Sequence, residues 1–329
     1  MNKSIFFRFE INKKVGSGHA VRCLRIAEFF KKKKFNIYLI ISNTSLENLK
    51  KNKINISNNF KILKIKDISL ISDAKNTINS IKNLRLKSQI YIFKDIYRFG
   101  LKWDNMIMRE YSRLIILDDF FNKKHNCKIY INYNPYRLNQ ITYSKKKIKY
   151  LVGLKYFPYP QKKFKKNKKN KCLIYFGASD NQNLTIKVVK ILNKINLTNI
   201  KFIVLLGKFN KSKKKIRKIT QNKNFNIIEE FIDLQKIYNN CKFMIGTGGT
   251  SLWEALINNL HPLIIPSHKN HINPCLYLAK RKKIKFLKNL KINENFKKNY
   301  FKKYLRFSIN NKNDIIDGKG LKRIYNNIK

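Results

Sequence analysis

Three observations predict that the chain folds as two doubly wound, Rossmann-like α/β domains that face a central cleft. Its 329 residues and 43% hydrophobic content are enough for two cores. Strand-like and helix-like segments alternate in each half, which is typical of a parallel sheet covered by helices. The stretch at residues 157–171, which contains two prolines and many lysines, has the composition of a linker between the halves.

The first domain is expected at residues 1–157, because six candidate strands in it are separated by helical patterns. These strands are Ser4–Phe9, Asn36–Ile41, Phe60–Ile65, Gln89–Phe93, Arg113–Leu117 and Lys128–Ile131. Two of the helical patterns between them cover Gly18–Lys32 and Asp73–Leu84.

A basic linker at residues 158–171 is expected to lead into a second domain at residues 172–329. Its candidate strands are Cys172–Phe176, Lys201–Leu206, Phe225–Glu229, Phe243–Ile245 and Leu263–Ile265. Its candidate helices lie near Asn183–Ile195, Ile232–Asn240, Ser251–Asn258 and Asn273–Lys282. Doubly wound sheets bind ligands at the carboxyl ends of their strands, so we expect a ligand cleft between the two domains.

The charge of the chain is extreme, with 73 Lys+Arg against 18 Asp+Glu and a formal net charge of +55. Such a field attracts polyanions, which makes nucleic acids and anionic membrane surfaces candidate partners. The lysines are spread over the whole chain, however, and no nucleic-acid-binding motif accompanies them. We therefore expect a general compositional effect and no specific nucleic-acid partner, and we leave peripheral contact with anionic surfaces open.

The cysteines and the apolar runs indicate the compartment. The chain has five cysteines and no Cys-x-x-Cys pair, which is typical of small core residues in a reducing environment. No apolar run approaches the length of a membrane span, and the N-terminus lacks a signal-peptide core. These features predict a soluble, cytoplasmic protein with no transmembrane segment.

The most informative motif is Val15-Gly16-Ser17-Gly18-His19, which connects the first predicted strand to the first helix. Glycines at such a turn let a ligand approach the backbone, and the N–H groups of the helix point toward it. His19 lies at the positive end of the helix dipole, which disfavours the imidazolium and predicts a neutral base at about pH 7.

A second glycine-rich motif follows a buried strand of the second half. Gly248, Gly249, Thr250 and Ser251 begin a helix whose N–H groups suit a pyrophosphate. Glu254 follows one turn later, where its carboxylate could accept hydrogen bonds from ribose hydroxyls. An equally good interpretation is a capping box, in which Glu254 bonds back to the Ser251 N–H.

Gly177 and Asp180 repeat the strand-then-glycine pattern after the first strand of the second half. A glycine–aspartate turn is usually only a helix cap. Two glycine loops at adjacent strand ends nevertheless favour a pocket for a nucleotide diphosphate.

No metal site or cofactor is predicted. The histidines at 125, 261 and 268 lack metal-ligand spacing with Cys or Asp. The pair Asp118-Asp119 is expected to be a strand-end turn in which one carboxylate caps the next segment.

Several short motifs occur in a fixed order along nearly the whole chain. They are Gly16-Ser17-Gly18-His19 with Arg22-Cys23-Leu24, Asp95-Ile96-Tyr97 with Trp103-Asp104, Leu117-Asp118-Asp119-Phe120, Gly153-Leu154-Lys155-Tyr156, Gly248–Glu254, Asn270-His271 and Asp317-Gly318-Lys319-Gly320. This ordered set resembles the UDP-2,4-diacetamido-2,4,6-trideoxy-β-L-altropyranose hydrolases of pseudaminic acid biosynthesis, relatives of the MurG-like GT-B glycosyltransferases.

The resemblance implies a GT-B fold and metal-independent hydrolysis of a UDP-sugar at C1, with inversion and release of UDP and the free sugar. Water is the implied acceptor, and His19 the base that activates it. The implied catalytic residues are His19, Tyr97 and Asn270. The implied substrate-binding residues are Arg8, Glu10, Gly16, Gly18, Arg22, Gly177, Asp180, Gly248, Gly249, Thr250, Ser251, Glu254 and His271.

The chain departs from the pattern of this family at several positions. Arg-Ala-Asp near the N-terminus reads Arg8-Phe9-Glu10, and Gly-Gly-Ser-Asp reads Gly177-Ala178-Ser179-Asp180. The histidine before Tyr97 is Ile96, and the glutamine after Asn270 is His271. These departures bear on the identity of the sugar more than on the nucleotide.

Two other functions stay open at this point. A glycosyltransferase of the same fold would pass the sugar to an acceptor rather than to water. A basic nucleic-acid-binding protein would bind DNA or RNA in a salt-sensitive way that does not need His19.

Overall fold

The computed structural model describes residues 3–12, 17–51, 54–66, 69–135, 147–160, 168–195, 197, 199–207, 209–221, 224–229, 234–291, 293–306 and 315–329. The chain forms two compact units, one of residues 1–161 together with 318–329 and the other of residues 162–317. The expected second domain therefore differs at its end, because the C-terminal helix belongs to the first unit.

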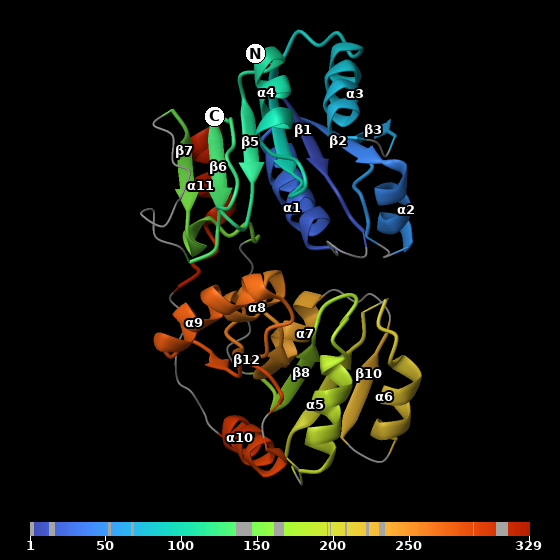
Figure 1. Ribbon diagram of the computed structural model, residues 1–329, viewed down its shortest axis with the longest axis vertical. Coiled ribbons are helices and arrows are strands. Elements are labelled where there is room, and N and C mark those ends of the chain that lie inside the picture. Colours follow the sequence, from blue (N-terminus) through green and yellow to red (C-terminus); the bar gives the residue numbers. More distant parts are fainter. Residues whose placement is uncertain are drawn as a thin grey trace. The chain divides into compact units, whose positions relative to one another are not determined.

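The first unit contains a seven-stranded parallel sheet in the order β3-β2-β1-β4-β5-β6-β7 (Figure 1). Its strands are β1 (Lys3–Phe9), β2 (Asn36–Ser42), β3 (Lys61–Ile65), β4 (Gln89–Asp95), β5 (Leu114–Leu117), β6 (Ile129–Asn132) and β7 (Lys149–Val152). The sequence analysis did not predict β7. It is an edge strand of four residues, KYLV, in which only Leu151 is buried.

Helices cover both faces of this sheet. One face packs against α1 (Gly18–Lys32), α2 (Asn43–Lys51) and α11 (Gly320–Ile328), and the other against α3 (Leu70–Lys82) and α4 (Leu101–Glu110). The short helix η2 (Leu154–Tyr156) lies next to α11. A Cβ on Gly320 would lie 2.1 Å from the carbonyl oxygen of Phe157, so the start of α11 requires glycine.

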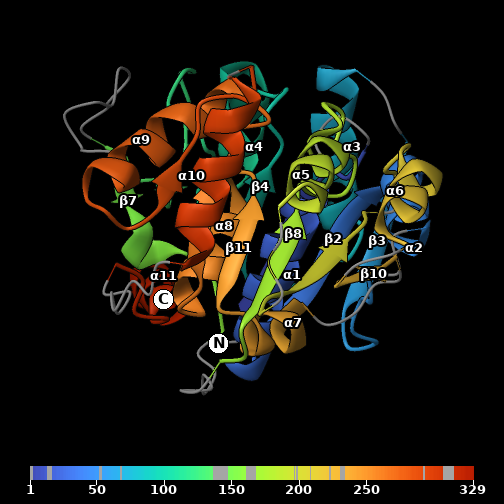
Figure 2. The same cartoon turned by 90° about the horizontal axis from the view of Figure 1, so that it is seen from below.

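The second unit contains a six-stranded parallel sheet in the order β10-β9-β8-β11-β12-β13; Figure 2 shows β8 and β11 pointing the same way. Its strands are β8 (Lys171–Tyr175), β9 (Lys201–Leu205), β10 (Phe225–Ile228), β11 (Phe243–Gly246), β12 (His261–Ile264) and β13 (Lys285–Phe286). Its helices are α5 (Leu184–Asn193), α6 (Lys213–Thr220), α7 (Leu234–Asn240), α8 (Thr250–Ile257), η3 (Lys269–His271), α9 (Ile272–Lys280) and α10 (Glu294–Arg306). No helix in the described ranges has both the length and the apolarity needed to cross a bilayer.

Two buried cations lie side by side on the face of the first sheet that α3 and α4 cover. Arg8 of β1 is the register partner of Lys94 of β4. Arg8 donates hydrogen bonds to Asp73 of α3, whereas Lys94 Nζ lies 2.5 Å from Asp104 of α4. Because like charges on neighbouring strands repel and a buried charge needs a partner, each cation depends on its own carboxylate. These pairs connect both helices to the sheet.

Arg8→Met removes one of these cations and leaves the Asp73 carboxylate buried without it. We expect the free energy of unfolding, measured by urea titration, to fall by about 3–5 kcal/mol, as for other broken buried ion pairs. Lys82→Met is the matched control, because it removes an exposed ion pair of 2.7 Å with Glu110. The control should change the same quantity by less than about 1 kcal/mol. Equal losses in the two variants would contradict a structural role for the Arg8 pair.

Candidate functional site

The candidate base His19 is the second residue of α1, directly after Gly18, and it is buried. Its Nδ1 lies 2.8 Å from Asp95 Oδ1 and 3.0 Å from the Asp95 carbonyl oxygen. A backbone carbonyl oxygen and an ionised carboxylate can only accept hydrogen bonds, so Nδ1 carries a proton. In the neutral form of the imidazole, Nε2 then keeps its lone pair. Gly16, the other glycine predicted in this loop, lies outside the described residues.

One turn further along α1, Arg22 binds groups at the ends of three strands. Its Nε and Nη2 each lie 2.5 Å from an oxygen of Asp95, which ends β4. Its Nη1 lies 2.9 Å from both oxygens of Asp119, beyond β5, and 2.6 Å from Tyr133 Oη, beyond β6. Arg22 is only 2% exposed, so these partners compensate a charge that is almost fully removed from water.

Asp95 and Arg22 hold each other in their charged forms. Burial opposes ionisation of Asp95, but Arg22 and His19 keep the pKa of its carboxyl group well below the usual range. Burial likewise opposes the charge of Arg22, but Asp119 and Asp95 keep its pKa well above the usual value. The charged Asp95 carboxylate, 2.8 Å from His19 Nδ1, therefore stabilises the imidazolium that forms when His19 accepts a proton.

Tyr97, predicted to be catalytic, lies beside His19. The two rings meet edge to face with their centroids 4.2 Å apart. The Tyr97 hydroxyl donates to Asp119, and Arg22 Nη2 lies 3.2 Å from its oxygen. Burial raises the pKa of Tyr97 well above its usual value, with a further contribution from Asp119 and despite Arg22, so the hydroxyl stays protonated. His19 and Tyr97 thus form one cluster at the carboxyl edge of the sheet.

The sequence analysis missed Asp95, Asp119 and Tyr133 as members of this cluster. A usable signal was present, because each of the three lies at or just beyond the end of a parallel strand, and such ends meet at one edge of the sheet. Asp118, by contrast, accepts from the N–H groups of Phe120 and Phe121, so it forms the strand-end turn that was expected.

Three of the predicted substrate-binding residues in the first unit have internal partners. Arg8 is fully buried in its pair with Asp73, on the face covered by α3, so no ligand can reach its guanidinium. Arg22 is used by the cluster described above. Glu10 lies just beyond β1 and forms an ion pair of 2.5 Å with Arg98. We therefore exclude Arg8 and Arg22 from the ligand-contacting residues.

Two of the departures from the family pattern fill the core of the first unit. Ile96 is buried in the apolar cluster that contains Trp103, and Phe9 is buried in the cluster on the opposite face of the sheet. Apolar residues at these two positions therefore have a packing reason.

In the second unit, the glycine loop after β11 leads into α8, and Gly249 is the N-cap residue with φ of +91°. Thr250 and Ser251 are the first helical residues, whose N–H groups have no partner within the helix. The capping-box interpretation is wrong, because Ser251 lies inside the helix and the N-cap residue Gly249 has no side chain. Glu254 accepts a 2.9 Å hydrogen bond from Tyr238 Oη. The loop therefore presents backbone donors at the carboxyl edge of this sheet.

Gly177 and Asp180 lie in the loop that follows β8, the strand next to β11. Gly177 has φ of +88°, which favours glycine. The Asp180 oxygens accept hydrogen bonds of 2.8 Å and 2.9 Å from the N–H groups of Leu184 and Thr185. Asp180 is buried and caps α5, so its carboxylate supports the loop from inside.

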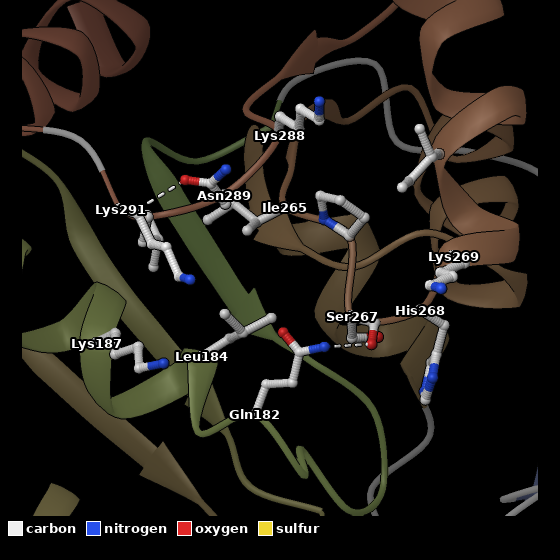
Figure 3. A pocket seen from close by; sticks show the side chains of 13 residues that line it. Gln182, Leu184, Lys187, Ile265, Ser267, His268, Lys269, Lys288, Asn289 and Lys291 are labelled. Atoms are coloured by element: carbon white, nitrogen blue, oxygen red, sulfur yellow. Dashed lines mark hydrogen bonds between the residues drawn. The ribbon is translucent and has the colours of Figure 1, made fainter.

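A pocket of about 680 Å³ lies at the ends of β12 and β13, beside the start of α5 (Figure 3). Gln182 Nε2 donates a 2.7 Å hydrogen bond to the Ser267 carbonyl in its wall. Asn270, predicted to be catalytic, is exposed on η3. The basic residues that line the pocket are Lys187, His268, Lys269, Lys288 and Lys291. Lysine is abundant throughout this chain, so the lining alone does not identify a ligand.

Among the described residues, no group of three or more His, Cys, Asp or Glu side chains could hold a metal ion.

Comparison with known proteins identifies the fold. No family model and no curated protein sequence matches the chain. MurG of Acinetobacter baumannii is similar with a TM-score of 0.69 and 12% identity, covering 100% of this chain and 99% of that one. The S. aureus MnaA–UDP co-structure has a TM-score of 0.65 at 13% identity, covering 100% and 96%. UDP-GlcNAc 2-epimerase of Neisseria meningitidis, bound to UDP-GlcNAc, has a TM-score of 0.63 at 14% identity, covering 99% of both chains. The chain has the GT-B fold, as the sequence predicted.

Asp95→Asn removes the central carboxylate charge and keeps its shape. Because the pKa of Asp95 is lower in the folded than in the unfolded chain, its ionisation stabilises the fold above about pH 4. This stabilisation is lost as the pH falls. We expect the free energy of unfolding of the wild type to fall more steeply than that of the variant between about pH 5 and about pH 3.

Denaturant titrations at several pH values measure the two slopes. Glu47→Gln is the matched control, since Glu47 is exposed on α2 in a 3.5 Å pair with Lys51, and it should reproduce the slope of the wild type. If Asp95→Asn also reproduces that slope, Asp95 is not held in its charged form as described.

Proposed function

We propose that this protein hydrolyses a UDP-linked 2,4-diacetamido-2,4,6-trideoxy sugar at C1, releasing UDP and the free sugar, in pseudaminic (nonulosonic) acid biosynthesis. The observation that carries the proposal is the His19–Asp95 pair, which directs the basic nitrogen of the imidazole away from the carboxylate. The GT-B fold supports it, since similar folds occur in proteins solved with UDP or UDP-GlcNAc. The ordered motifs of the sequence support the choice of sugar.

In the proposed reaction, His19 Nε2 removes a proton from water as the water oxygen attacks the anomeric carbon. The bond from that carbon to the β-phosphate oxygen breaks, and the configuration inverts because water enters opposite to UDP. Asp95 holds the ring through Nδ1 and stabilises the imidazolium as it forms. Tyr97, next to His19, contacts the sugar.

The second unit binds the nucleotide in this proposal. The N–H groups of Thr250 and Ser251 at the start of α8 bind the diphosphate and stabilise the charge of the leaving UDP. The glycines of the loops after β8 and β11 let the phosphates approach the backbone. The Glu254 carboxylate, oriented by Tyr238, accepts hydrogen bonds from the ribose hydroxyls. Asn270 lies near the sugar. No metal takes part in the proposed mechanism.

The alternative is a glycosyltransferase that uses the same UDP-sugar as donor, and the likeness to MurG keeps it open. The same base would then remove a proton from an acceptor hydroxyl instead of from water. The two functions differ in one observable, because only the hydrolase releases UDP when no acceptor is present.

UDP release from UDP-2,4-diacetamido-2,4,6-trideoxy-β-L-altrose, without any acceptor, tests the proposal. We expect steady release by the wild type and a loss of at least about 100-fold in kcat for His19→Ala, because a general base is removed. His261→Ala is the control, since His261 lies at the start of β12 outside the proposed machinery, and it should keep wild-type activity.

Two results would contradict the hydrolase proposal. If the wild type binds UDP but releases none from this substrate, the result favours the glycosyltransferase alternative. If His19→Ala releases UDP as fast as the wild type, His19 is not the base.

A further inference from the structure

We propose that His271 makes diphosphate binding at the start of α8 proton-linked, so that the imidazolium of His271 and the bound diphosphate stabilise each other. This inference rests on the nucleotide site proposed above and adds a pH response to it. At this position the family that the chain resembles has a glutamine, which cannot titrate.

The ring of His271 lies directly against the glycine loop. A Cβ on Gly248 would come within 2.7 Å of His271 Cβ, and a Cβ on Gly249 would come within 3.3 Å of His271 Nε2. Nε2 is therefore adjacent to the N-cap residue of α8, where the N–H groups of Thr250 and Ser251 begin the helix. An anion bound by those N–H groups would lie next to this nitrogen.

The other side of the ring is fixed by hydroxyl groups. His271 Nδ1 lies 3.1 Å from Thr247 Oγ1, which accepts a 3.1 Å hydrogen bond from the Ser267 N–H. Thr247 Oγ1 also lies 2.8 Å from Ser267 Oγ. Because a hydroxyl can donate or accept, this contact holds the ring in place in both its neutral and its charged form.

The start of α8, against which the ring packs, carries the positive end of the helix dipole and therefore opposes a positive charge on His271 when no anion is bound. His268 meets His271 edge to face at 5.3 Å between centroids, and the thiol of Cys275 on α9 lies beside Gly248. Glu254, the carboxylate of α8, is 3% exposed and bonded to Tyr238.

A diphosphate at the helix start reverses this balance, because its negative charges attract the imidazolium. By linkage, the protonated form then binds the diphosphate more tightly than the neutral form. The affinity contributed by His271 is therefore present at low pH and lost as the pH rises.

Binding of UDP and of uridine, measured by calorimetry at about pH 6 and about pH 8, tests the inference. His271→Gln keeps a hydrogen-bond donor that cannot titrate, and His271→Phe keeps a ring without a donor. We expect the affinity ratio of wild type to His271→Gln for UDP to rise by about tenfold from the higher pH to the lower one. UDP itself titrates near pH 6, but this affects every variant equally and cancels in the ratio.

We further expect His271→Phe to bind UDP more weakly than the wild type by at least about tenfold at the lower pH. Uridine, which has no phosphate, should bind equally to all three proteins. His268→Gln is the control for the neighbouring imidazole and should keep the pH dependence of the wild type.

The outcomes separate this inference from the proposed function. An affinity ratio that does not change with pH, wild-type UDP binding by His271→Phe, or loss of the pH dependence in His268→Gln would overturn the role of His271 and leave the nucleotide site standing. If the wild type binds no UDP at all, the nucleotide site and this inference both fail.

Discussion

The candidate catalytic site of the first unit depends on one buried guanidinium. Arg22 projects from α1 and contacts Asp95, Asp119 and Tyr133, which end or follow three neighbouring strands. A buried charge has to be compensated, so the strand ends cannot shift without a large loss of free energy. The same contacts hold the Asp95 carboxylate in position for His19. The orientation of His19 therefore depends on Arg22, although Arg22 is not itself available to a ligand.

Each unit has its own parallel sheet, and the two sheets carry different chemical groups at the carboxyl ends of their strands. In the first unit, charged side chains gather at this edge, and the His19 imidazole lies beside Tyr97. In the second unit, the edge consists of glycines and helix N–H groups, with His271 packed on them. A base next to a fixed carboxylate suits activation of a nucleophile, whereas backbone donors suit a phosphate.

The sequence predicted the fold class well, because alternation of buried strands and amphipathic helices is a local signal. It did not predict β7, a four-residue edge strand beside β6, nor the return of α11 to the first unit. The resemblance implied catalytic roles for His19 and Tyr97, but their edge-to-face contact became visible only in the structure. The roles of Arg8 and Arg22 could not be predicted, because an arginine at a strand end or on a helix can face a ligand or a buried carboxylate. Only the positions of Asp73 and Asp119 decide between these two environments.

The central claim is that Asp95 fixes His19 in the tautomer with the proton on Nδ1. Long-range proton–nitrogen NMR of the imidazole nitrogens, assigned by comparison with His19→Gln, measures this directly in the unliganded protein near neutral pH. The account predicts that Nδ1 is protonated and that Nε2 has the chemical shift of an unprotonated ring nitrogen. A proton on Nε2 and a bare Nδ1 would contradict it, because the basic nitrogen would then face Asp95 instead of the substrate.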